Sequence, residues 1–370
     1  MCSFEDGKYL RIIDYKSSIK NIDLNEVYAG LQIQLLTYLD AACKEEDLLP
    51  AGILYFNLIE QMVKAEKNIG IEKIEEQIRK GFKMKGLILA DVKVVKLHDK
   101  NLDSGYSNLV PAYISKKTGD ISEGNSSCVS KEEFKDLQDY MYKVIKQISN
   151  EILSGKIDLK PFYKNKKTPC SYCDYKSICN FNNGACQNKY NFIDEKSKKE
   201  ILEKIKQENI DKLYGNKLTT SISKLEQYRR CPFSYFLQYG LKIKPQEELK
   251  VQSFDTGTFM HETIDEFFSI VKENGYQLSE LTEEQISEII DKIIDEKLLQ
   301  NKNYIFTSTA KYRALVVRLK RLVKKALKYI VETLTLSEFN VLGTEIEFDE
   351  KGKYKPIRIT LDNGKNVEII

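Results

Sequence analysis

The pattern of apolar and polar residues along the first part of the chain predicts a short series of strands and helices. Residues 8–16 (KYLRIIDYK) have a strand pattern that begins with alternating side chains and ends on polar ones. Residues 51–59 are a short apolar run that predicts a buried strand, and residues 26–43 carry the apolar stripe of a helix. Residues 86–97 fit a strand or a short helix equally well. These elements are the frame for the motifs described below.

The rest of the chain is mainly helical by the same criterion, and strands return at its end. Further helices are expected at 71–81, 131–154, 221–240, 257–274, 283–299 and 309–336. Near the start of the third of these, Ser223 and Glu226 have the spacing of a capping box. Residues 100–130 are rich in Ser, Gly, Asn and Asp and predict a surface loop region. The chain ends in three strand-like runs, VLGTEIEF, YKPIRITL and KNVEII, with turn signals at Lys351-Gly352 and Asn363-Gly364.

Composition limits the possible classes of protein. The chain has 370 residues, of which 42% are hydrophobic and 31% charged, so it can bury a sizeable core and is not disordered throughout. The 58 Lys and Arg nearly balance the 55 Asp and Glu, which excludes a strongly basic coat but not a local basic groove. No apolar run approaches 18 residues, and the start MCSFEDGKYL lacks a secretory pattern. We therefore expect a cytoplasmic protein with no membrane span.

Candidate catalytic residues begin at the end of the first strand. Asp14 and Lys16 flank Tyr15, and at the two-residue period of a strand both leave the same face. A carboxylate that holds Mg²⁺ beside a lysine that positions or deprotonates water suits phosphodiester hydrolysis, although a surface ion pair has the same spacing. Gln34 and Tyr38, at i and i+4 of the next helix, can hydrogen-bond a phosphate or form an ordinary polar edge.

Other candidate ligands are a histidine and a group of cysteines. His261, in GTFMHETIDEFF, can add a nitrogen ligand to an oxygen-rich metal site, although a single helical histidine is more often structural. Cys170, Cys173 and Cys179 have the spacing C-x2-C-x5-C, which suits zinc or an iron–sulfur cluster. The spacing leaves the fourth ligand open between Cys186 and Cys231, and with Cys186 the site would be a local zinc knuckle.

Taken together, the motifs resemble a known family. The segments LRIIDYKSS, GLQIQLLTYLDAA, PCSYCDYKSIC, SISKLEQYRRCPFSYFLQYGL and GTFMHETIDEFF resemble the RecB-type branch of the PD-(D/E)XK nucleases. The resemblance is closer still to the nuclease domain of the B subunit of bacterial AddAB-type helicase–nucleases. It implies a restriction-endonuclease-like α/β fold, with a mixed sheet flanked by helices and an Fe–S-stapled lobe. It also implies Mg²⁺-dependent exonucleolytic cleavage of single-stranded DNA and a partner AddA-type helicase–nuclease subunit.

The resemblance assigns roles to the candidate residues. Asp14 and His261 would hold the metal, Lys16 would assist the attacking water, and Gln34 and Tyr38 would support the phosphate. For the cysteines, the resemblance selects Cys231 as the fourth ligand of a [4Fe–4S] cluster, with Cys170, Cys173 and Cys179. In the family this cluster clamps the two ends of the nuclease domain together.

The chain departs from the family pattern in its order. In the family the CPF segment and the histidine helix come first, whereas here they follow the D-Y-K strand and the cysteine triplet. The chain is therefore expected to be circularly permuted, with the family's later half at 1–190, a charged linker at 191–215 and the family's earlier half at 216–370. A natural permutation, an artefact of assembly and deliberate construction fit the sequence equally well.

A second departure is a missing motif. The family's G-x-I-D-R-I-D strand, which supplies an acidic metal ligand, would fall between NVEII and MCSFEDGKYL, and no segment of the chain contains it. We expect weakened metal binding, impaired activity and an unpaired or displaced sheet edge. Glu345 and Glu347 are weak candidates for a replacement ligand.

The sequence also bears on DNA binding and on rival functions. Residues 311–328 form a basic amphipathic helix, which suits a DNA backbone or a solvated face over an apolar stripe; its basic residues are Arg313, Arg318, Lys320, Arg321, Lys324, Lys325 and Lys328. The chain contains no G-x4-G-K-[ST] loop, so we expect no ATP chemistry. The rival functions are a non-catalytic DNA-binding or structural Fe–S module and a Cas4-like stand-alone exonuclease.

Overall fold

The chain folds into two compact units, each assembled from three separate segments. The computed structural model describes residues 2–4, 7–60, 63, 70–179, 181, 190–192, 214, 217–244, 253–299, 305–344, 346, 348–350 and 352–370. Unit 1 comprises residues 1–21, 47–134 and 248–345, and unit 2 comprises residues 22–46, 135–247 and 346–370. Each unit thus combines residues from both sides of the expected linker at 191–215. Most of the charged linker expected at 191–215 lies outside the described residues, as do Cys186, Glu345 and Glu347.

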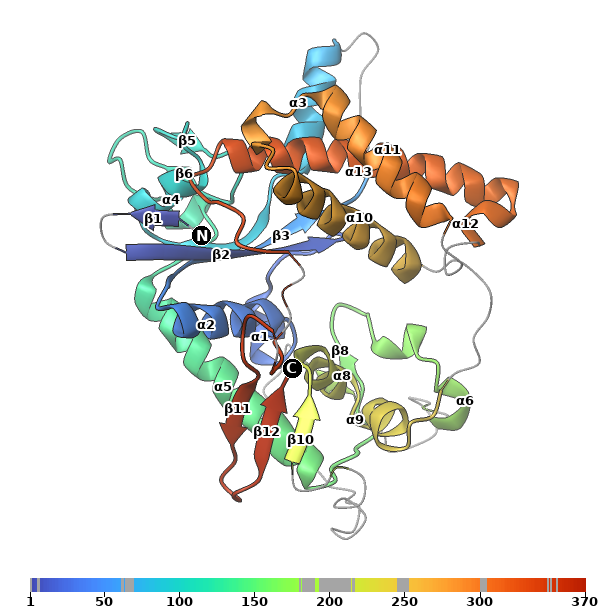
Figure 1. The fold of residues 1–370 in the computed structure, drawn as a ribbon. Helices are drawn as coiled ribbons and strands as arrows, with labels where there is room; N and C mark the ends of the chain where they lie inside the picture. Colours follow the sequence, from blue (N-terminus) through green and yellow to red (C-terminus); the bar gives the residue numbers. More distant parts are fainter. Residues whose placement is uncertain are drawn as a thin grey trace. The chain divides into compact units, whose positions relative to one another are not determined.

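A mixed five-stranded sheet is the centre of unit 1 (Figure 1). Its strands are, in spatial order, β1 (Cys2–Phe4), β2 (Gly7–Lys16), β3 (Leu49–Asn57), β4 (Lys85–Leu89) and β7 (Cys128–Val129). The β2–β3 and β4–β7 pairs are parallel, whereas β1–β2 and β3–β4 are antiparallel. Strand β3 is buried along most of its length, as its continuous apolar run predicts.

Helices cover one face of this sheet and form the main core of unit 1. The helices of unit 1 are α3 (Ile71–Gly81), α4 (Val92–His98), α10 (Ser253–Glu273), α11 (Glu283–Leu298), α12 (Ile305–Ser308) and α13 (Ala310–Thr335). Leu54 and Phe56 of β3 join apolar residues of α10, α11 and α13 in one buried cluster, against which Ile13 and Tyr15 of β2 also pack. Figure 1 shows α10 and α13 on the same side of β2 and β3. Short elements complete the unit: β5 (Gly105–Tyr106), β6 (Tyr113–Ile114), η1 (Glu123–Asn125) and η4 (Leu278–Glu280).

Unit 2 is built on helices and a small sheet. Its helices include α1 (Leu24–Tyr28), α2 (Gln34–Glu46), α5 (Lys131–Leu153, in this unit from Lys135 onward), α8 (Ile222–Arg230) and α9 (Pro232–Tyr235). Strand β12 (Asn366–Ile369) pairs in parallel with β10 (Lys217–Thr220) and antiparallel with β11 (Ile357–Thr360). Shorter elements are β8 (Phe162–Tyr163), η2 (Pro169–Tyr172), α6 (Lys176–Cys179), β9 (Asn191–Phe192) and the π-helical turn η3 (Phe236–Gly240).

Three of the expected helices and strands were wrong. The helix expected at 26–43 is two helices, because Gly30 (φ +81°) and Gln32 (φ +54°) adopt left-handed backbone conformations between α1 and α2. The helix expected at 221–240 is interrupted at Cys231, whose extended backbone precedes Pro232. The run VLGTEIEF contains no strand among its described residues. The ambiguous run 86–97 contains both a strand and a helix, separated at Ala90 and Asp91.

Candidate active site

The end of β2 presents an acid and a base on one face of the unit 1 sheet. The Asp14 carboxylate lies 2.8 Å from the Lys16 ammonium, and the two side chains are 19% and 32% exposed. Register pairs Asp14 with Tyr55 of β3, and the Lys16 nitrogen lies 6.0 Å from the centre of the Tyr55 ring. The expected shared face is therefore confirmed by the strand geometry. The pair is open enough to meet a ligand and sheltered enough to have a defined position.

His261 contacts β2 at Tyr15, the residue between Asp14 and Lys16. The His261 ring packs edge-on against Tyr15 with the ring centres 6.2 Å apart. Tyr15 points to the apolar cluster, on the face of β2 opposite to Asp14 and Lys16. One helical turn before His261, Gly257 approaches Ser17, whose Oγ would lie 3.1 Å from a Cβ at that position. The G-x3-H spacing thus brings α10 against the end of β2 at two points.

A buried asparagine holds the loop that follows Lys16. The Asn57 side chain accepts a hydrogen bond from the Lys20 backbone N–H (2.8 Å) and donates one to the Lys20 carbonyl (3.2 Å). The Lys16 carbonyl accepts from the N–H of Leu58 (2.7 Å). The chain is therefore anchored on both sides of Ser17. Sequence reasoning missed Asn57, and the signal was a polar residue inside the otherwise apolar run 51–59.

A buried cationic cluster supports β2 nearer its start. The Arg11 guanidinium donates to His98 Nδ1 (3.3 Å) and to Ser337 Oγ (3.0 Å) and lies over the Phe339 ring. Burial lowers the pKa of Arg11 to about 10. Burial and the nearby Arg11 charge lower the pKa of His98 to about 3. Because a guanidinium only donates, Nδ1 must accept, and the proton on Nε2 faces the Ala51 carbonyl at 3.4 Å.

Among the described strands, β2 is paired on both sides only near its start. Strand β1 pairs with Gly7, Lys8 and Tyr9 alone, whereas β3 pairs with β2 from Tyr9 to Lys16. From Leu10 onward, no strand within the described ranges is paired with the other side of β2. In the part of the chain that the structure describes, no three His, Cys, Asp or Glu side chains are grouped so as to hold a metal ion.

Gln34 and Tyr38 lie together in unit 2. Gln34 is the first residue of α2, and its side-chain amide donates to the Tyr38 hydroxyl (3.0 Å). The Tyr38 ring stacks on Phe348 with centres 5.1 Å apart and planes within 16°. Phe348 in turn stacks on Tyr354, whose hydroxyl donates to Glu46 at the end of α2 (2.8 Å). The two side chains therefore have defined positions relative to their own helix.

The four cysteines proposed as cluster ligands also belong to unit 2. Cys231 is buried, and Cys170, Cys173 and Cys179 are partly buried. Burial is the main cause that raises the pKa of the Cys231 thiol to about 12, and the nearby Cys170 and Cys173 contribute to that rise. Cys231 thus lies near two cysteines that are about 60 positions away in the sequence. Among the described residues, these cysteines do not form a group that could hold a metal ion.

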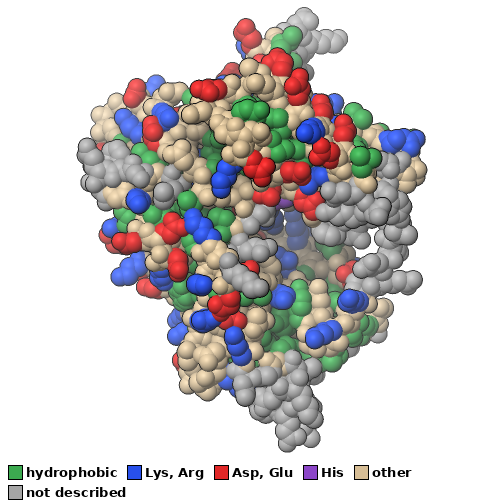
Figure 2. Space-filling view, viewed as in Figure 1, with side chains coloured by type: hydrophobic (Ala, Val, Ile, Leu, Met, Phe, Trp, Pro, Cys, Tyr) green, Lys and Arg blue, Asp and Glu red, His purple; other side chains and the backbone are tan. Residues whose placement is uncertain are grey.

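The expected basic helix is largely neutralised within unit 1. Arg318 and Arg321 both pair with Glu60. Lys320 and Lys324 pair with Asp291 of α11, and Lys328 pairs with Glu283. Figure 2 shows acidic and basic side chains interleaved over this helical region. The arrangement agrees with a solvated face over the buried stripe of α13.

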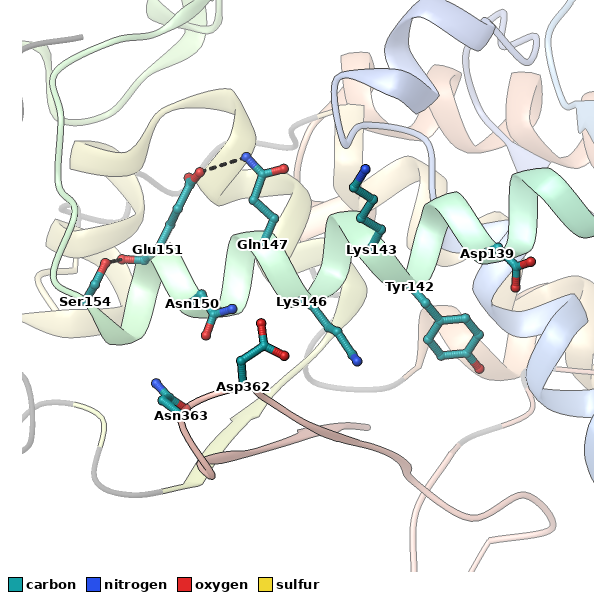
Figure 3. A pocket seen from close by; sticks show the side chains of 10 residues that line it. All are labelled: Asp139, Tyr142, Lys143, Lys146, Gln147, Asn150, Glu151, Ser154, Asp362 and Asn363. Carbon is teal, nitrogen blue, oxygen red and sulfur yellow. Dashed lines mark hydrogen bonds between the residues drawn. The ribbon is translucent and has the colours of Figure 1, made fainter. Parts of the chain in front are cut away.

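A polar cavity of about 750 Å³ lies along α5 and the β11–β12 turn (Figure 3). Its lining residues are Asp139, Tyr142, Lys143, Lys146, Gln147, Asn150, Glu151, Ser154, Asp362 and Asn363. These residues include no member of the expected catalytic set. The lining mixes two lysines with three acids, so its charge favours no single class of ligand. No described helix is both long and apolar enough to cross a lipid bilayer.

Comparisons with known proteins agree with the motifs. The sequence model of the PD-(D/E)XK nuclease superfamily matches residues 3–180 and 219–368. The B subunit of the ATP-dependent helicase/deoxyribonuclease from Alkaliphilus metalliredigens is 42% identical over 215 residues, which are 56% of this chain and 18% of that protein. The proteins of the same name from Clostridium tetani and Bacillus licheniformis are 43% and 41% identical over 210 and 209 residues, 55% of this chain and 18% of each. The chain thus spans less than a fifth of the length of these relatives. The two matched blocks cover both the D-Y-K strand and the histidine helix, and the chain belongs to the PD-(D/E)XK nuclease superfamily.

Proposed function

We propose that the chain is the nuclease module of the B subunit of a helicase–nuclease and hydrolyses DNA exonucleolytically in the presence of Mg²⁺. The Asp14–Lys16 pair at the end of β2 carries this proposal, because it places a hard oxygen ligand 2.8 Å from a proton-transfer group. The names of the relatives support DNA as the substrate. The proposed location is the cytoplasm, where the DNA of a bacterial cell is found.

Each residue of the expected site has a part in this proposal. Asp14 and His261 are the proposed ligands of Mg²⁺, although His261 packs on Tyr15, on the face of β2 opposite to Asp14. When bound, the metal would polarise the phosphoryl oxygen and stabilise developing negative charge. Lys16 would orient or deprotonate the attacking water, and its charge would offset that of the phosphate. Gln34 and Tyr38 would donate hydrogen bonds to a DNA phosphate. Tyr15 and Ser17 support the site through their contacts with α10.

The nuclease activity of this chain is expected to be low, because few metal ligands are present. Two candidate ligands, one of them an imidazole, are few for a cation that prefers six oxygens. No G-x-I-D-R-I-D motif occurs in the sequence to add a carboxylate. Beyond Tyr9, no described strand pairs with the side of β2 opposite to β3, which supports the idea that an acidic strand belongs there. We therefore expect weak Mg²⁺ binding, partly offset by Mn²⁺, which accepts nitrogen ligands more readily.

Cys170, Cys173, Cys179 and Cys231 would hold a [4Fe–4S] cluster. Four thiolates are the usual ligand set of such a cluster, and the electrostatic influence of Cys170 and Cys173 on Cys231 supports their association. A cluster there would join segments on both sides of the expected linker. Such a cluster would bring the old chain ends close together, which is the arrangement in which a circular permutation is tolerated.

The proposed partner is an AddA-type helicase–nuclease subunit. The relatives carry the name of a B subunit, and this chain contains no G-x4-G-K-[ST] phosphate loop. ATP-driven unwinding would then come from outside these 370 residues. A Cas4-like stand-alone exonuclease is the alternative, and it would degrade DNA without such a partner.

The nuclease function is tested with an end-labelled single-stranded oligonucleotide and the full chain in Mg²⁺ or Mn²⁺. Lys16→Ala is expected to lower the cleavage rate at least about 100-fold, because a positioned proton-transfer group contributes about that much or more. Lys20→Ala is the matched control, because the hydrogen bonds of Lys20 with Asn57 use its backbone. DNA binding without cleavage would instead identify a non-catalytic module, and equal rates in the two variants would reject the role of Lys16.

The cluster is tested by anaerobic purification and metal analysis. The protein is expected to be brown with about four iron atoms per chain. Cys231→Ser should lose the iron, whereas Cys43→Ser and Cys186→Ser should retain it. One zinc per chain without iron would overturn the assignment and favour a zinc knuckle.

A further inference from the structure

The start of α2 is capped by a residue that is remote in the sequence. Helix α2 has no acidic residue in its first turn, and the left-handed Gln32 precedes it. The Glu226 carboxylate on α8 accepts the N–H of Ile33 (2.9 Å) and the N–H of Gln34 (3.3 Å) through the same oxygen. An N-terminal helix turn leaves such N–H groups without helical partners. Glu226 therefore satisfies groups that α2 cannot satisfy itself.

Glu226 is held in this position by its own surroundings. It is only 8% exposed, and its second oxygen lies 3.8 Å from Arg230, one turn later on α8. The expected capping box with Ser223 is wrong, because Ser221 is the N-cap of α8 and its side chain makes no capping hydrogen bond. The carboxylate thus serves another helix. A negative charge at a helix N-terminus is also favoured by the helix dipole.

The turn that Glu226 caps is the one that carries Gln34. Any shift of the first turn of α2 moves the Gln34 side chain and its hydrogen bond to the Tyr38 hydroxyl. The Tyr38 ring is restrained separately, by its stack on Phe348. Loss of the cap would therefore change the position of Gln34 relative to Tyr38 before it unfolds the helix.

We propose that Glu226 is a positioning residue, which sets the first turn of α2 and thereby the place where Gln34 and Tyr38 meet a DNA phosphate. This inference rests on the proposed role of Gln34 and Tyr38 in the nuclease reaction. Misplacement of a phosphate-contacting group by about 1 Å can lower a rate by about 100-fold. Glu226→Ala is therefore expected to lower kcat/KM by about 10-fold to 100-fold. Glu226→Gln keeps an acceptor oxygen and is expected to recover most of the loss.

The structural part of the inference is tested by hydrogen exchange in the full chain. Glu226→Ala should speed exchange of the Ile33 and Gln34 amides about fivefold or more, because each loses its acceptor. Glu226→Gln should change it less. Ser223→Ala is the matched control on the same helix and should leave both amides unchanged. Unchanged exchange in Glu226→Ala would overturn the proposal.

A double-mutant cycle distinguishes positioning from a general structural role. In a Gln34→Ala, Tyr38→Phe background, Glu226→Ala should lower kcat/KM by less than about twofold, because the groups that it positions are already absent. An undiminished effect in that background would refute positioning. If the unmodified chain cleaves no DNA, the proposed nuclease function alone fails. The Kd for a single-stranded oligonucleotide is then measured in place of kcat/KM. If Glu226→Ala weakens binding equally in the unmodified chain and in the Gln34→Ala, Tyr38→Phe background, the role of Glu226 is again rejected.

Discussion

Replacing the buried His98 is expected to make unit 1 less sensitive to acid. His98 lies beside Arg11, and burial together with the Arg11 charge lowers its pKa from 6.5 to about 3. Below pH 6.5 the unfolded chain therefore binds a proton that the folded chain excludes. Since the unfolded state binds more protons there, the free energy of unfolding falls as the pH falls through that range.

The size of the effect follows from the two pKa values. Between about pH 7.5 and about pH 5.0, His98 alone should lower the free energy of unfolding by about 2 kcal/mol, since each pH unit below 6.5 costs about 1.4 kcal/mol. His98→Gln keeps an acceptor for Arg11 and a donor for the Ala51 carbonyl but binds no proton in this range. The variant should therefore lose about 2 kcal/mol less than the unmodified protein over the same change in pH.

Urea unfolding at the two pH values, followed by circular dichroism, measures this difference. Lys96→Gln is the control, because Lys96 lies on the same helix α4 and its contact with Asp103 is exposed. It should leave the pH dependence unchanged. If the unmodified chain and His98→Gln lose the same free energy within about 0.5 kcal/mol, the burial argument for His98 is refuted.

Two further substitutions test packing in the two units. Gly86→Ala should destabilise unit 1 by more than about 2 kcal/mol in urea unfolding, because Gly86 has φ +151° and a Cβ would lie 2.1 Å from a carbonyl oxygen of β3. A Cβ added at Gly124 would have no neighbour within 4 Å, so Gly124→Ala should change the free energy of unfolding by less than about 0.5 kcal/mol. Equal destabilisation by the two substitutions would contradict the steric argument. Tyr142→Phe removes a hydroxyl that donates to the buried Asp40 carboxylate and should cost about 1.5 kcal/mol. The Tyr140 hydroxyl donates to an exposed carbonyl, so Tyr140→Phe should destabilise the protein less than Tyr142→Phe. A larger loss for Tyr140→Phe would reject the reasoning.

Local periodicity was a reliable guide where an element's own residues decide its limits. The strand expected at 8–16 is β2 (Gly7–Lys16), and the helix expected at 131–154 is α5 (Lys131–Leu153). The helix expected at 309–336 is α13 (Ala310–Thr335). Each of these elements has a regular apolar face, and that face is buried whichever neighbouring element covers it. The shared face of Asp14 and Lys16 follows from the strand period in the same way.

Local patterns failed where a distant segment decides the outcome. The break between α1 and α2 depends on the left-handed Gly30 and on a cap from Glu226, which is 193 positions from Ile33. The same carboxylate matched a capping box in its own helix by spacing alone. Spacing could not show that a buried neighbour with unsatisfied N–H groups competes for it.

The sequence by itself determined the family, the D-Y-K strand and the cysteine spacing, because each depends on residues that are close along the chain. Only the tertiary structure decided the partners of those residues. It placed His261 on Tyr15, Asn57 under the loop after Lys16, and Glu226 at the start of α2. Each of these contacts joins segments that lie far apart in the sequence. Their formation depends on how buried surfaces pack, and one-dimensional spacing carries no record of that packing.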